Sequence, residues 1–396
     1  MARRAIIVGA GIGGLSAGIA LRKAGWDVRI FERSAALREL GFGLGLAPNA
    51  MAALAELGVA DVVQARSCEP TSAEARRLDG TVLKRATLPR GLLGGPFVVA
   101  MRPALYGALL DAVGVDTVTP GIEATGFTVN GDRVTLSLAN GTSVDADLLV
   151  GADGVGSNIR RQLHPSEPPP RPSRIVSVRG AIDGAVRQLG DTDAIYYVGP
   201  GTESAFIRAS ATGIYWFFAV AEELVAPDVR RLADTATSMA AATKAVLTHM
   251  APRFDDTFRA ITSATSELHY DGILVDRDPL PTWGTGVVTL IGDAAHPMLP
   301  HTGQGAAQAI VDAVTLGKML RGDTTVERTL RAFEAERQPK TAALVRQGRR
   351  TARFMRIRSP IVCYAREIAL RAVPVKSIMK LYVRVNRRAG TDVRTG

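Results

Sequence analysis

The 396-residue sequence predicts a mixed α/β fold, with a parallel sheet and crossover helices, a second and largely antiparallel sheet, and a helical C-terminal tail. Three observations predict it. Short apolar runs at 5–8, 148–150 and 287–291 end in glycine turns, which is typical of strands buried on both faces of a parallel sheet. Strand-like runs separated by turn residues fill 173–283. Proline-led helical patterns follow in 346–396.

The composition indicates a globular chain in a reducing compartment. An apolar fraction of 46% is enough for buried cores, which excludes intrinsic disorder of the whole chain. Cys68 and Cys363 fit neither a disulfide framework nor a metal-ligand spacing, so we expect a cytoplasmic protein without a metal site. Arg3 and Arg4 before an apolar run imitate a secretory signal, but glycines interrupt that run, and no stretch reaches the ~18 apolar residues of a membrane span.

The formal net charge of +10 is concentrated near the C-terminus. Residues 346–396 contain 14 Lys/Arg and 2 Asp/Glu, a balance of +12 that leaves −2 for the rest of the chain. Because that remainder is nearly neutral and contains no nucleic-acid-binding motif, we expect no nucleic acid partner.

Two helices are predicted in this basic tail, Ile361–Ala372 and Val375–Arg388, each with a proline at or just before its start. The second combines an apolar stripe with a basic stripe, made of Val375, Ile378, Tyr382 and Val385 and of Lys376, Lys380, Arg384 and Arg388. Such a pattern is typical of interfacial helices. Two interpretations stay open, which are weak peripheral contact with an anionic membrane and packing of the apolar stripe on the main body.

The first functional motif is a glycine-rich turn between a strand and a helix. Gly9, Gly11 and Gly14 have the G-x-G-x-x-G spacing. The first permits a tight turn, the second lets the backbone approach a pyrophosphate, and the third lets helix and strand pack closely. The next strand, Trp26–Phe31, ends at Glu32, whose carboxylate could accept hydrogen bonds from ribose hydroxyls. Together these features predict a Rossmann-like dinucleotide-binding domain, and the motif alone leaves FAD and NAD open.

Two later segments repeat the pattern of an apolar strand and a sharp turn. The first turn is 151–154 (GADG), after which Ser157 opens a helix. The second is 292–305 (GDAAHPMLPHTGQG), and a helix begins at about Ala306. Glycines on both sides of Gln304 would leave N–H groups and the positive end of that helix open to a negatively charged ligand. His296 is expected to be a structural turn residue rather than a catalyst.

In this order and at these separations, the three segments resemble the class A flavoprotein monooxygenases. These are single-component FAD-dependent aromatic hydroxylases, typified by para-hydroxybenzoate hydroxylase. The resemblance covers about residues 4–345 and is most specific at 151–154, 292–305 and Asp312. Further similar features are Pro48-Asn49-Ala50 after Gly41, Gly43 and Gly45, Arg102 in VVAMRPALYGALL, and FEAERQPK at 333–340.

The resemblance implies a bound FAD and a transient NADH or NADPH. It places the glycine motif and Glu32 at the adenosine and pyrophosphate end, and Arg102 and Asp293 at the ribityl or pyrophosphate part. Asp153 belongs to the segment that supports both the pyrophosphate and the visiting nicotinamide. The expected cofactor-binding residues are Gly9, Gly11, Gly14, Glu32, Arg102, Asp153, Asp293, Gly303, Gln304 and Gly305. There is no second G-x-G-x-x-G motif for a separate nicotinamide domain.

The predicted FAD-binding domain is discontinuous and consists of 1–70, 96–172 and 284–345. A substrate-binding sheet domain is predicted for 71–95 and 173–283, and the tail 346–396 completes the chain. The elements expected after residue 172 are strands at Arg174–Ile182, Ala194–Val198, Ser204–Ser210, Gly213–Val220 and Leu268–Leu274, and one helix at Leu232–Met250.

Aromatic residues concentrate in these strands and indicate an apolar substrate site. Strand alternation puts Tyr215 and Phe217 on one face and Trp216 and Phe218 on the other, without indicating which face lines the site. The candidate substrate residues are Arg179, Arg208, Tyr215, Phe217 and Pro300. The arginines could hold a phenolate or enolate, and the tyrosine could relay a proton. No general base is evident.

We therefore expect an FAD-dependent monooxygenase that uses NAD(P)H and O₂. As the resemblance implies, it would hydroxylate an aromatic, polycyclic or enol-like apolar small molecule through a flavin C4a-hydroperoxide. Epoxidation, Baeyer–Villiger oxidation and N-hydroxylation occur on the same fold. Two further interpretations stay open, namely a flavin reductase or dehydrogenase without oxygenation, and a membrane-surface flavoprotein with a non-catalytic role.

Overall fold

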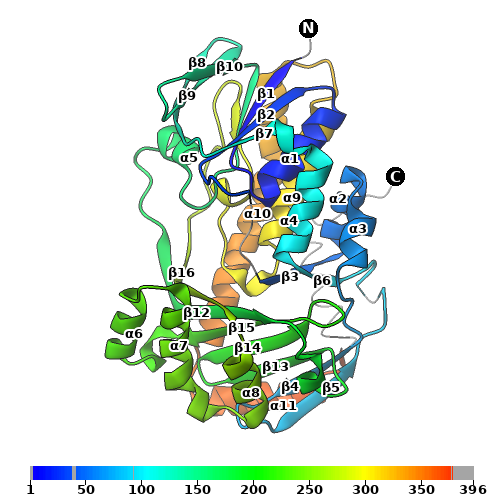
Figure 1. The fold of residues 1–396 in the computed structure, drawn as a ribbon, viewed down its shortest axis with the longest axis vertical. Coiled ribbons are helices and arrows are strands. Elements are labelled where there is room, and N and C mark those ends of the chain that lie inside the picture. The colour runs from blue at the N-terminus through cyan, green and yellow to red at the C-terminus, as the bar shows by residue number, and fades with distance from the viewer. Residues whose placement is uncertain (1–2, 38–41, 92, 376, 378–396) are drawn as a thin grey trace.

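The computed structural model describes residues 3–37, 42–91, 93–375 and 377. It consists of a body built on a parallel sheet and a body built on a seven-stranded sheet, and the long helix α10 (Val326–Met355) runs from one to the other (Figure 1). The predicted mixed α/β fold class is confirmed. Gly41 and most of the predicted helix Val375–Arg388 lie outside the described residues.

The parallel sheet has the strand order β17-β11-β1-β2-β7. Its strands are β1 (Arg4–Val8), β2 (Asp27–Glu32), β7 (Val118–Pro120), β11 (Leu148–Gly151) and β17 (Val288–Leu290). The three apolar runs predicted from the sequence are therefore neighbours in one sheet. All residues of β11 and β17 are buried, as expected for strands that are covered on both faces.

Helices α1 (Ile12–Lys23) and α9 (Gly305–Met319) pack side by side on this sheet. Small residues allow their close approach, since a Cβ atom added at Gly317 would lie 2.7 Å from the Cβ of Ala20. The other elements of this body are α2 (Pro48–Leu57), α3 (Ala60–Ala65), α4 (Arg102–Val113), α5 (Asn158–Leu163), the pair β3 (Gly43–Leu46) and β6 (Val98–Met101), and the three-stranded β8 (Ala124–Asn130), β9 (Arg133–Leu138) and β10 (Ser143–Ala146).

The seven-stranded sheet has the order β16-β12-β15-β14-β13-β4-β5 and is antiparallel except between β13 and β4. Its strands are β4 (Ser72–Arg76), β5 (Val82–Thr87), β12 (Arg171–Ile182), β13 (Ala194–Gly199), β14 (Thr202–Arg208), β15 (Ile214–Ala221) and β16 (Glu267–Asp276). The five strands expected after residue 172 are present, and 72–87 supplies the edge pair β4–β5.

The single helix predicted at Leu232–Met250 is wrong. The chain forms two helices, α6 (Pro227–Asp234) and α7 (Met239–Met250), and α8 (Asp256–Ala264) follows. The break contains Ser238, whose Oγ accepts a hydrogen bond from the N–H of Ala241 and so caps the start of α7. The helical spacing of apolar residues continues from α6 into α7, which is why one helix was predicted. A serine that caps a free helix N–H nevertheless favours the start of a second helix at this point.

The two faces of the seven-stranded sheet have different environments, which the alternation of Tyr215 to Phe218 could not assign. Trp216 and Phe218 are fully buried on the face that packs against α7 and α8, where Phe254 and Phe258 stack at 3.7 Å between ring centroids. Tyr215 and Phe217 lie on the opposite face, together with Phe97, Val99 and Met101 from the region of β6. That second face is turned toward the parallel-sheet body (Figure 1).

Candidate functional site

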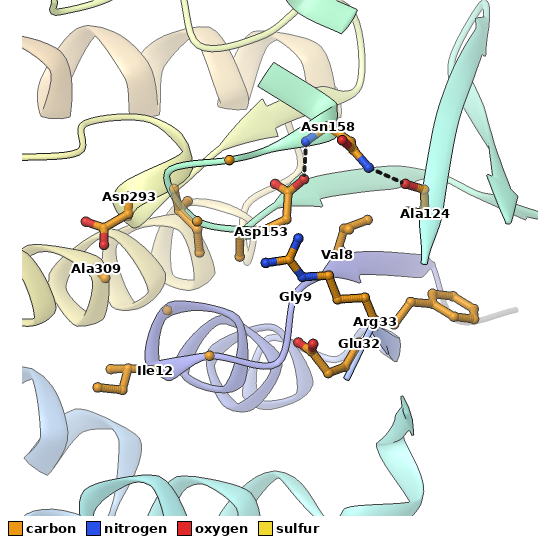
Figure 2. Close-up of a pocket in the computed structure, with 18 of the residues that line it drawn as sticks. Val8, Gly9, Ile12, Glu32, Arg33, Ala124, Asp153, Asn158, Asp293 and Ala309 are labelled. Atoms are coloured by element: carbon orange, nitrogen blue, oxygen red, sulfur yellow. Dashed lines mark hydrogen bonds between the residues drawn. The ribbon is translucent and has the colours of Figure 1, made fainter. Parts of the chain in front are cut away.

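A cavity of about 300 Å³ opens where β1, β2 and β11 end and α1 begins (Figure 2). Ligands of doubly wound α/β folds bind at this carboxyl edge of the sheet. Seven of the ten predicted cofactor-binding residues line it, namely Gly9, Gly11, Glu32, Arg102, Asp153, Asp293 and Gly305. Gly14, Gly303 and Gln304 are not among its lining residues.

The glycine turn has the geometry that its spacing predicts. Gly9 has a φ of +101°, and a Cβ atom there would lie 2.5 Å from the carbonyl oxygen of Ala152. A Cβ atom at Gly14 would lie 1.9 Å from the carbonyl oxygen of Gly9. Gly14 therefore acts through helix–strand packing, and Gly9 and Gly11 leave the backbone at the start of α1 open to the cavity.

Backbone N–H groups hold the Glu32 carboxylate at the cavity wall. Its Oε2 accepts a hydrogen bond of 2.8 Å from the N–H of Ala10, and its Oε1 accepts one of 2.8 Å from the N–H of Ser34. Each oxygen keeps a further lone pair for a ribose hydroxyl. Sequence reasoning missed Arg33, which directly follows Glu32 and extends across the same cavity in Figure 2.

Asp153 lines the cavity, but its carboxylate mainly organises the start of α5. Its Oδ1 accepts a hydrogen bond of 2.5 Å from Ser157 Oγ, and its Oδ2 accepts one of 2.7 Å from the N–H of Asn158. Burial raises the pKa of Asp153, and these hydrogen bonds act in the opposite direction. The side chain of Asn158 also donates to the carbonyl oxygen of Ala124, which ties this turn to β8 (Figure 2).

A buried ionic cluster supports the turn that carries Asp293. Asp312 is fully buried, and its Oδ2 accepts a hydrogen bond from the N–H of Gly292 and contacts His296 Nε2 at 2.6 Å. Arg337 Nε donates to the other carboxylate oxygen at 2.6 Å. Burial alone would raise the pKa of Asp312, but Arg337 and then His296 lower it below its usual value. Through this contact His296 helps to hold the turn, and its role as a structural residue stays a prediction. Arg337 was missed within the 333–340 motif.

The segment 296–304 carries three buried polar atoms that have no hydrogen-bond partner among the described residues. They are His296 Nδ1, His301 Nε2 and Gln304 Nε2. Gln304 is fully buried, and its Oε1 accepts hydrogen bonds from Asn49 and Gln308. Because a buried unpaired polar group costs about 1–3 kcal/mol, such a concentration fits a segment that is completed by a ligand.

The structure brings three of the five predicted substrate residues to one sheet face. The register places Arg179 opposite Phe217, with Tyr215 two positions away on the same face. Arg179 forms a two-pronged ion pair with Asp271 and lies over the Phe42 ring at 5.5 Å from its centroid. Neither Asp271 nor Phe42 was expected from the sequence, because their separation from Arg179 along the chain hides the contact.

The other two predicted substrate residues lie elsewhere. Arg208, at the end of β14, donates to the carbonyl oxygens of Ser210 and Ala211 and pairs with Asp193. The register sets Arg208 opposite Ile214, which faces the α7–α8 side. Pro300 is exposed at the start of the 3₁₀ turn Pro300–Thr302.

Three features together fit a dinucleotide cofactor. They are the glycine turn, Glu32 at the end of β2, and the buried polar atoms without partners in the segment 296–304 before α9. A family model described as FAD binding domain matches residues 3–348. The chain belongs to this family. Its relatives include the aurachin C monooxygenase/isomerase of Stigmatella aurantiaca, 32% identical over 92% of this chain and 93% of the relative. The phenazine 1,6-dicarboxylic acid hydroxylase of Lysobacter antibioticus is 36% identical over 87% of this chain and 88% of the relative.

Among solved structures, Klebsiella pneumoniae HpxO complexed with FAD and uric acid superposes with a TM-score of 0.86. It is 26% identical in sequence, and the match covers 97% of each chain. This FAD-binding chain is an FAD-dependent monooxygenase of the single-component aromatic hydroxylase type, for which NAD(P)H is the typical co-substrate. The predicted family, enzyme class and FAD cofactor are confirmed.

Proposed function

We propose that this FAD-binding chain hydroxylates an apolar, fused-ring aromatic that carries a ring hydroxyl. The supporting observation is the sheet face with Tyr215, Phe217, Ala205 and Ile207, of which the last two are buried aliphatic positions. Arg179 on this face is already paired with Asp271. A neutralised arginine binds a carboxylate weakly, so the face favours an apolar ring over a small aromatic acid.

In this proposal, the cavity that extends from Glu32 to the start of α9 would hold FAD. Glu32 would hold the adenosine ribose, the turn at Gly9 and Gly11 the pyrophosphate, and Asp293 the ribityl part. Bound FAD supplies the acceptance of a hydride from NAD(P)H and the activation of O₂. The start of α9 at Gly305 would present its N–H groups and positive end to negative charge on the ring, whereas the N–H of Gly303 already donates to the carbonyl oxygen of Pro300. The apolar sheet face would keep water away from the reacting atoms.

A screen of the purified enzyme against candidate substrates tests this proposal. Flavin absorbance is recorded first. NADH and NADPH oxidation is then measured with the fused-ring compounds 2-naphthol, 4-hydroxyquinoline and 1-hydroxyphenazine, and with the acids 3-hydroxybenzoate and 6-hydroxynicotinate. We expect manyfold stimulation by a fused-ring compound and oxygen-18 from O₂ in its product. Stimulation by the acids alone would contradict the apolar assignment, and NAD(P)H oxidation without labelled product would favour a reductase.

Tyr215 should act as a hydrogen-bond donor and not as a base. Burial raises its pKa to about 12, so the phenol stays protonated at neutral pH. We expect Tyr215→Phe to lower kcat/KM for the substrate by about 5- to 10-fold, the equivalent of one neutral hydrogen bond of ~1 kcal/mol. The matched control is Tyr270→Phe, whose hydroxyl donates to Asp234 and whose strand position pairs with Val178 of the α7–α8 face. A changed pH profile below pH 9 in Tyr215→Phe would oppose a donor role.

We also propose weak peripheral contact of the C-terminal segment 360–396 with an anionic membrane. The predicted helix at 361–372 is present as α11 (Pro360–Ala372). Ile361, Tyr364 and Ile368 recur on one side of it and are 81%, 63% and 49% exposed. Glu367 turns inward and pairs with Arg77. The outward side of α11 is therefore apolar, next to a tail that is rich in arginine and lysine.

Vesicle co-sedimentation tests this contact. At about 1 kcal/mol per basic residue near an anionic surface, we expect salt-sensitive binding to anionic vesicles and little binding to neutral ones. Removal of 374–396 and the double variant Ile361→Ser/Ile368→Ser should each weaken it. Equal binding to both vesicle types would refute the proposal. None of the helices in the described part of the chain has the length and apolarity needed to cross a bilayer.

A further inference from the structure

A histidine–glutamate pair joins the segment 296–304 to the seven-stranded sheet. His301 lies in the 3₁₀ turn Pro300–Thr302, and its Nδ1 is 2.8 Å from Oε1 of Glu203 on β14. The side chains are only 3% and 20% exposed, respectively. Because a carboxylate oxygen can only accept, Nδ1 carries the hydrogen. When the imidazole is neutral, its single N–H is therefore at Nδ1, and Nε2 carries a lone pair that can accept a proton.

That Nε2 atom is buried and has no partner among the described residues. A histidine with one ring nitrogen held by a carboxylate and the other without a partner has the arrangement of an oriented proton acceptor. His296 shares this arrangement through Asp312, but its ring packs beside Trp283 in the core of the parallel-sheet body rather than on the sheet face of Tyr215 and Phe217. Gln304, a second residue of this segment with an unpartnered buried nitrogen, immediately precedes α9. Both unpartnered atoms therefore belong to the chain segment to which we assign the flavin ring.

The register places this pair on the aromatic face of the sheet. Glu203 is opposite Ala219, and Ala205, two positions along β14, is opposite Phe217. The His301–Glu203 pair is therefore one cross-strand row from Phe217, between the segment before α9 and the proposed substrate face.

Other titratable groups on this face are less suited to accept a proton. Asp271 is engaged by Arg179 and by Ser177 Oγ. Tyr215 is protonated at neutral pH because burial raises its pKa. His269 is 28% exposed, and its Nε2 is 3.6 Å from Asp271, too far for a hydrogen bond that would fix its ring. From α10, Arg349 is paired with Asp276 and Asp278.

We propose that His301 is the general base of this enzyme, and that Glu203 positions it. This inference rests on the proposed function, since the base acts on a ring hydroxyl. The substrate O–H bond breaks, its proton forms an N–H bond at Nε2, and the Glu203 carboxylate stabilises the imidazolium. The ionised oxygen pushes electron density to the ring carbon that takes the oxygen atom. When that carbon loses its hydrogen as a proton and aromaticity returns, Nε2 gives its proton back to the ring oxygen.

The proton held by the His301–Glu203 pair is thus returned in every cycle. The overall reaction is balanced: the substrate, O₂, NAD(P)H and one proton give the hydroxylated product, NAD(P)⁺ and water. O₂ is reduced, the nicotinamide and the substrate are oxidised, and no further reactant is needed.

The first test reads the histidine tautomer and needs no substrate. The chain has five histidines, so ¹⁵N-histidine labelling of the FAD-loaded protein gives few resonances, and His301→Gln identifies the signal of His301. We expect hydrogen on Nδ1 and a lone pair on Nε2. Hydrogen on Nε2 at neutral pH would overturn the proposal, whatever the substrate screen yields.

The second test measures product formation with the hydroxyarene that is hydroxylated in the screen, and with its ring-fluorinated analogue, whose hydroxyl is already ionised at the assay pH. General base catalysis is worth about 10²- to 10⁴-fold, so His301→Gln should lose about that much with the parent compound and recover to within ~10-fold with the analogue. Glu203→Gln should lose about 10-fold and recover likewise. His249→Gln, on α7 beyond the opposite face, is the matched control and should keep wild-type rates.

Several results would overturn the assignment. These are an unchanged rate in His301→Gln, an equal loss with both hydroxyarenes, or a loss in His269→Gln that the analogue rescues while His301→Gln stays active. Rates of all variants are compared per bound flavin, so that a loss of FAD in His301→Gln is not counted as a loss of base catalysis. If no panel compound is hydroxylated, the proposed function fails, and the tautomer measurement still decides the geometry.

Discussion

Replacing Gly11 with valine is expected to give a folded protein that has lost FAD. Gly11 precedes α1 with φ −74° and ψ −175°, an extended conformation that valine adopts without strain. Its backbone lines the cavity, so a branched side chain would fill space that we assign to the pyrophosphate. Overpacking typically costs about 1–3 kcal/mol, which lowers the affinity for FAD by about 10- to 100-fold. Flavin absorbance per protein and calorimetric titration with FAD measure the change.

The matched control for Gly11→Val is Gly107→Val. Gly107 lies within α4, and a Cβ atom there meets nothing within 4 Å. This variant should retain FAD and show the same circular dichroism as wild type. Glu32→Ala and Asp293→Ala should also be flavin-poor, whereas substitutions at Gly14 should lower the yield of folded protein because of the clash with Gly9. Full FAD occupancy in Gly11→Val, Glu32→Ala and Asp293→Ala would refute the site assignment.

Arg337→Met is expected to cause the largest loss of stability. Arg337 is 1% exposed, and it donates to Asp312 and to Gln308 Oε1 at 2.5 Å. Without it, the buried carboxylate keeps only His296 and the N–H of Gly292. Breaking a buried ion pair in this way costs about 3–5 kcal/mol of the free energy of unfolding. Urea unfolding of the FAD-loaded protein measures this loss. Lys340→Met is the control, since Lys340 and Glu336 on the same helix are 32% and 44% exposed and their pair should contribute under ~1 kcal/mol.

The pH dependence separates this electrostatic effect from lost packing. In the wild type the pKa of Asp312 is lowered, so its contribution is present above the unfolded pKa and is lost as pH falls through the folded value. Without Arg337, burial should dominate and raise that pKa above the unfolded value. The variant should then recover stability relative to wild type as the pH falls from 8 to 5. The double variant Arg337→Met/Asp312→Asn should be less pH-dependent than Arg337→Met. A constant stability difference across this range would indicate that packing alone is lost.

The sequence by itself determined the features whose chemistry is local. The spacing of Gly9, Gly11 and Gly14 predicts the tight turn because φ > 0 and close backbone approach depend on a few consecutive residues. The apolar runs before Gly151 and Gly292 likewise predict buried strands. The order of these segments was enough to identify the family, the FAD cofactor and the enzyme class. The five strands of the seven-stranded sheet that follow residue 172 were also predicted from local patterns.

Only the tertiary structure decided which side chains meet. Alternation shows that Tyr215 and Phe217 share a face, but the choice of face depends on where α7, α8 and β6 pack. The partners of Arg179 and His301 are side chains 92 and 98 residues away, and no local signal gives such a contact. The prediction of one helix across 232–250 was wrong because the apolar residues keep a helical spacing throughout, whereas Ser238 caps the start of a second helix. Pairing between distant segments is set by register and burial, which a one-dimensional pattern does not specify. This pairing neutralises the half-buried Arg179 with Asp271 and leaves Nε2 of His301 buried without a partner among the described residues.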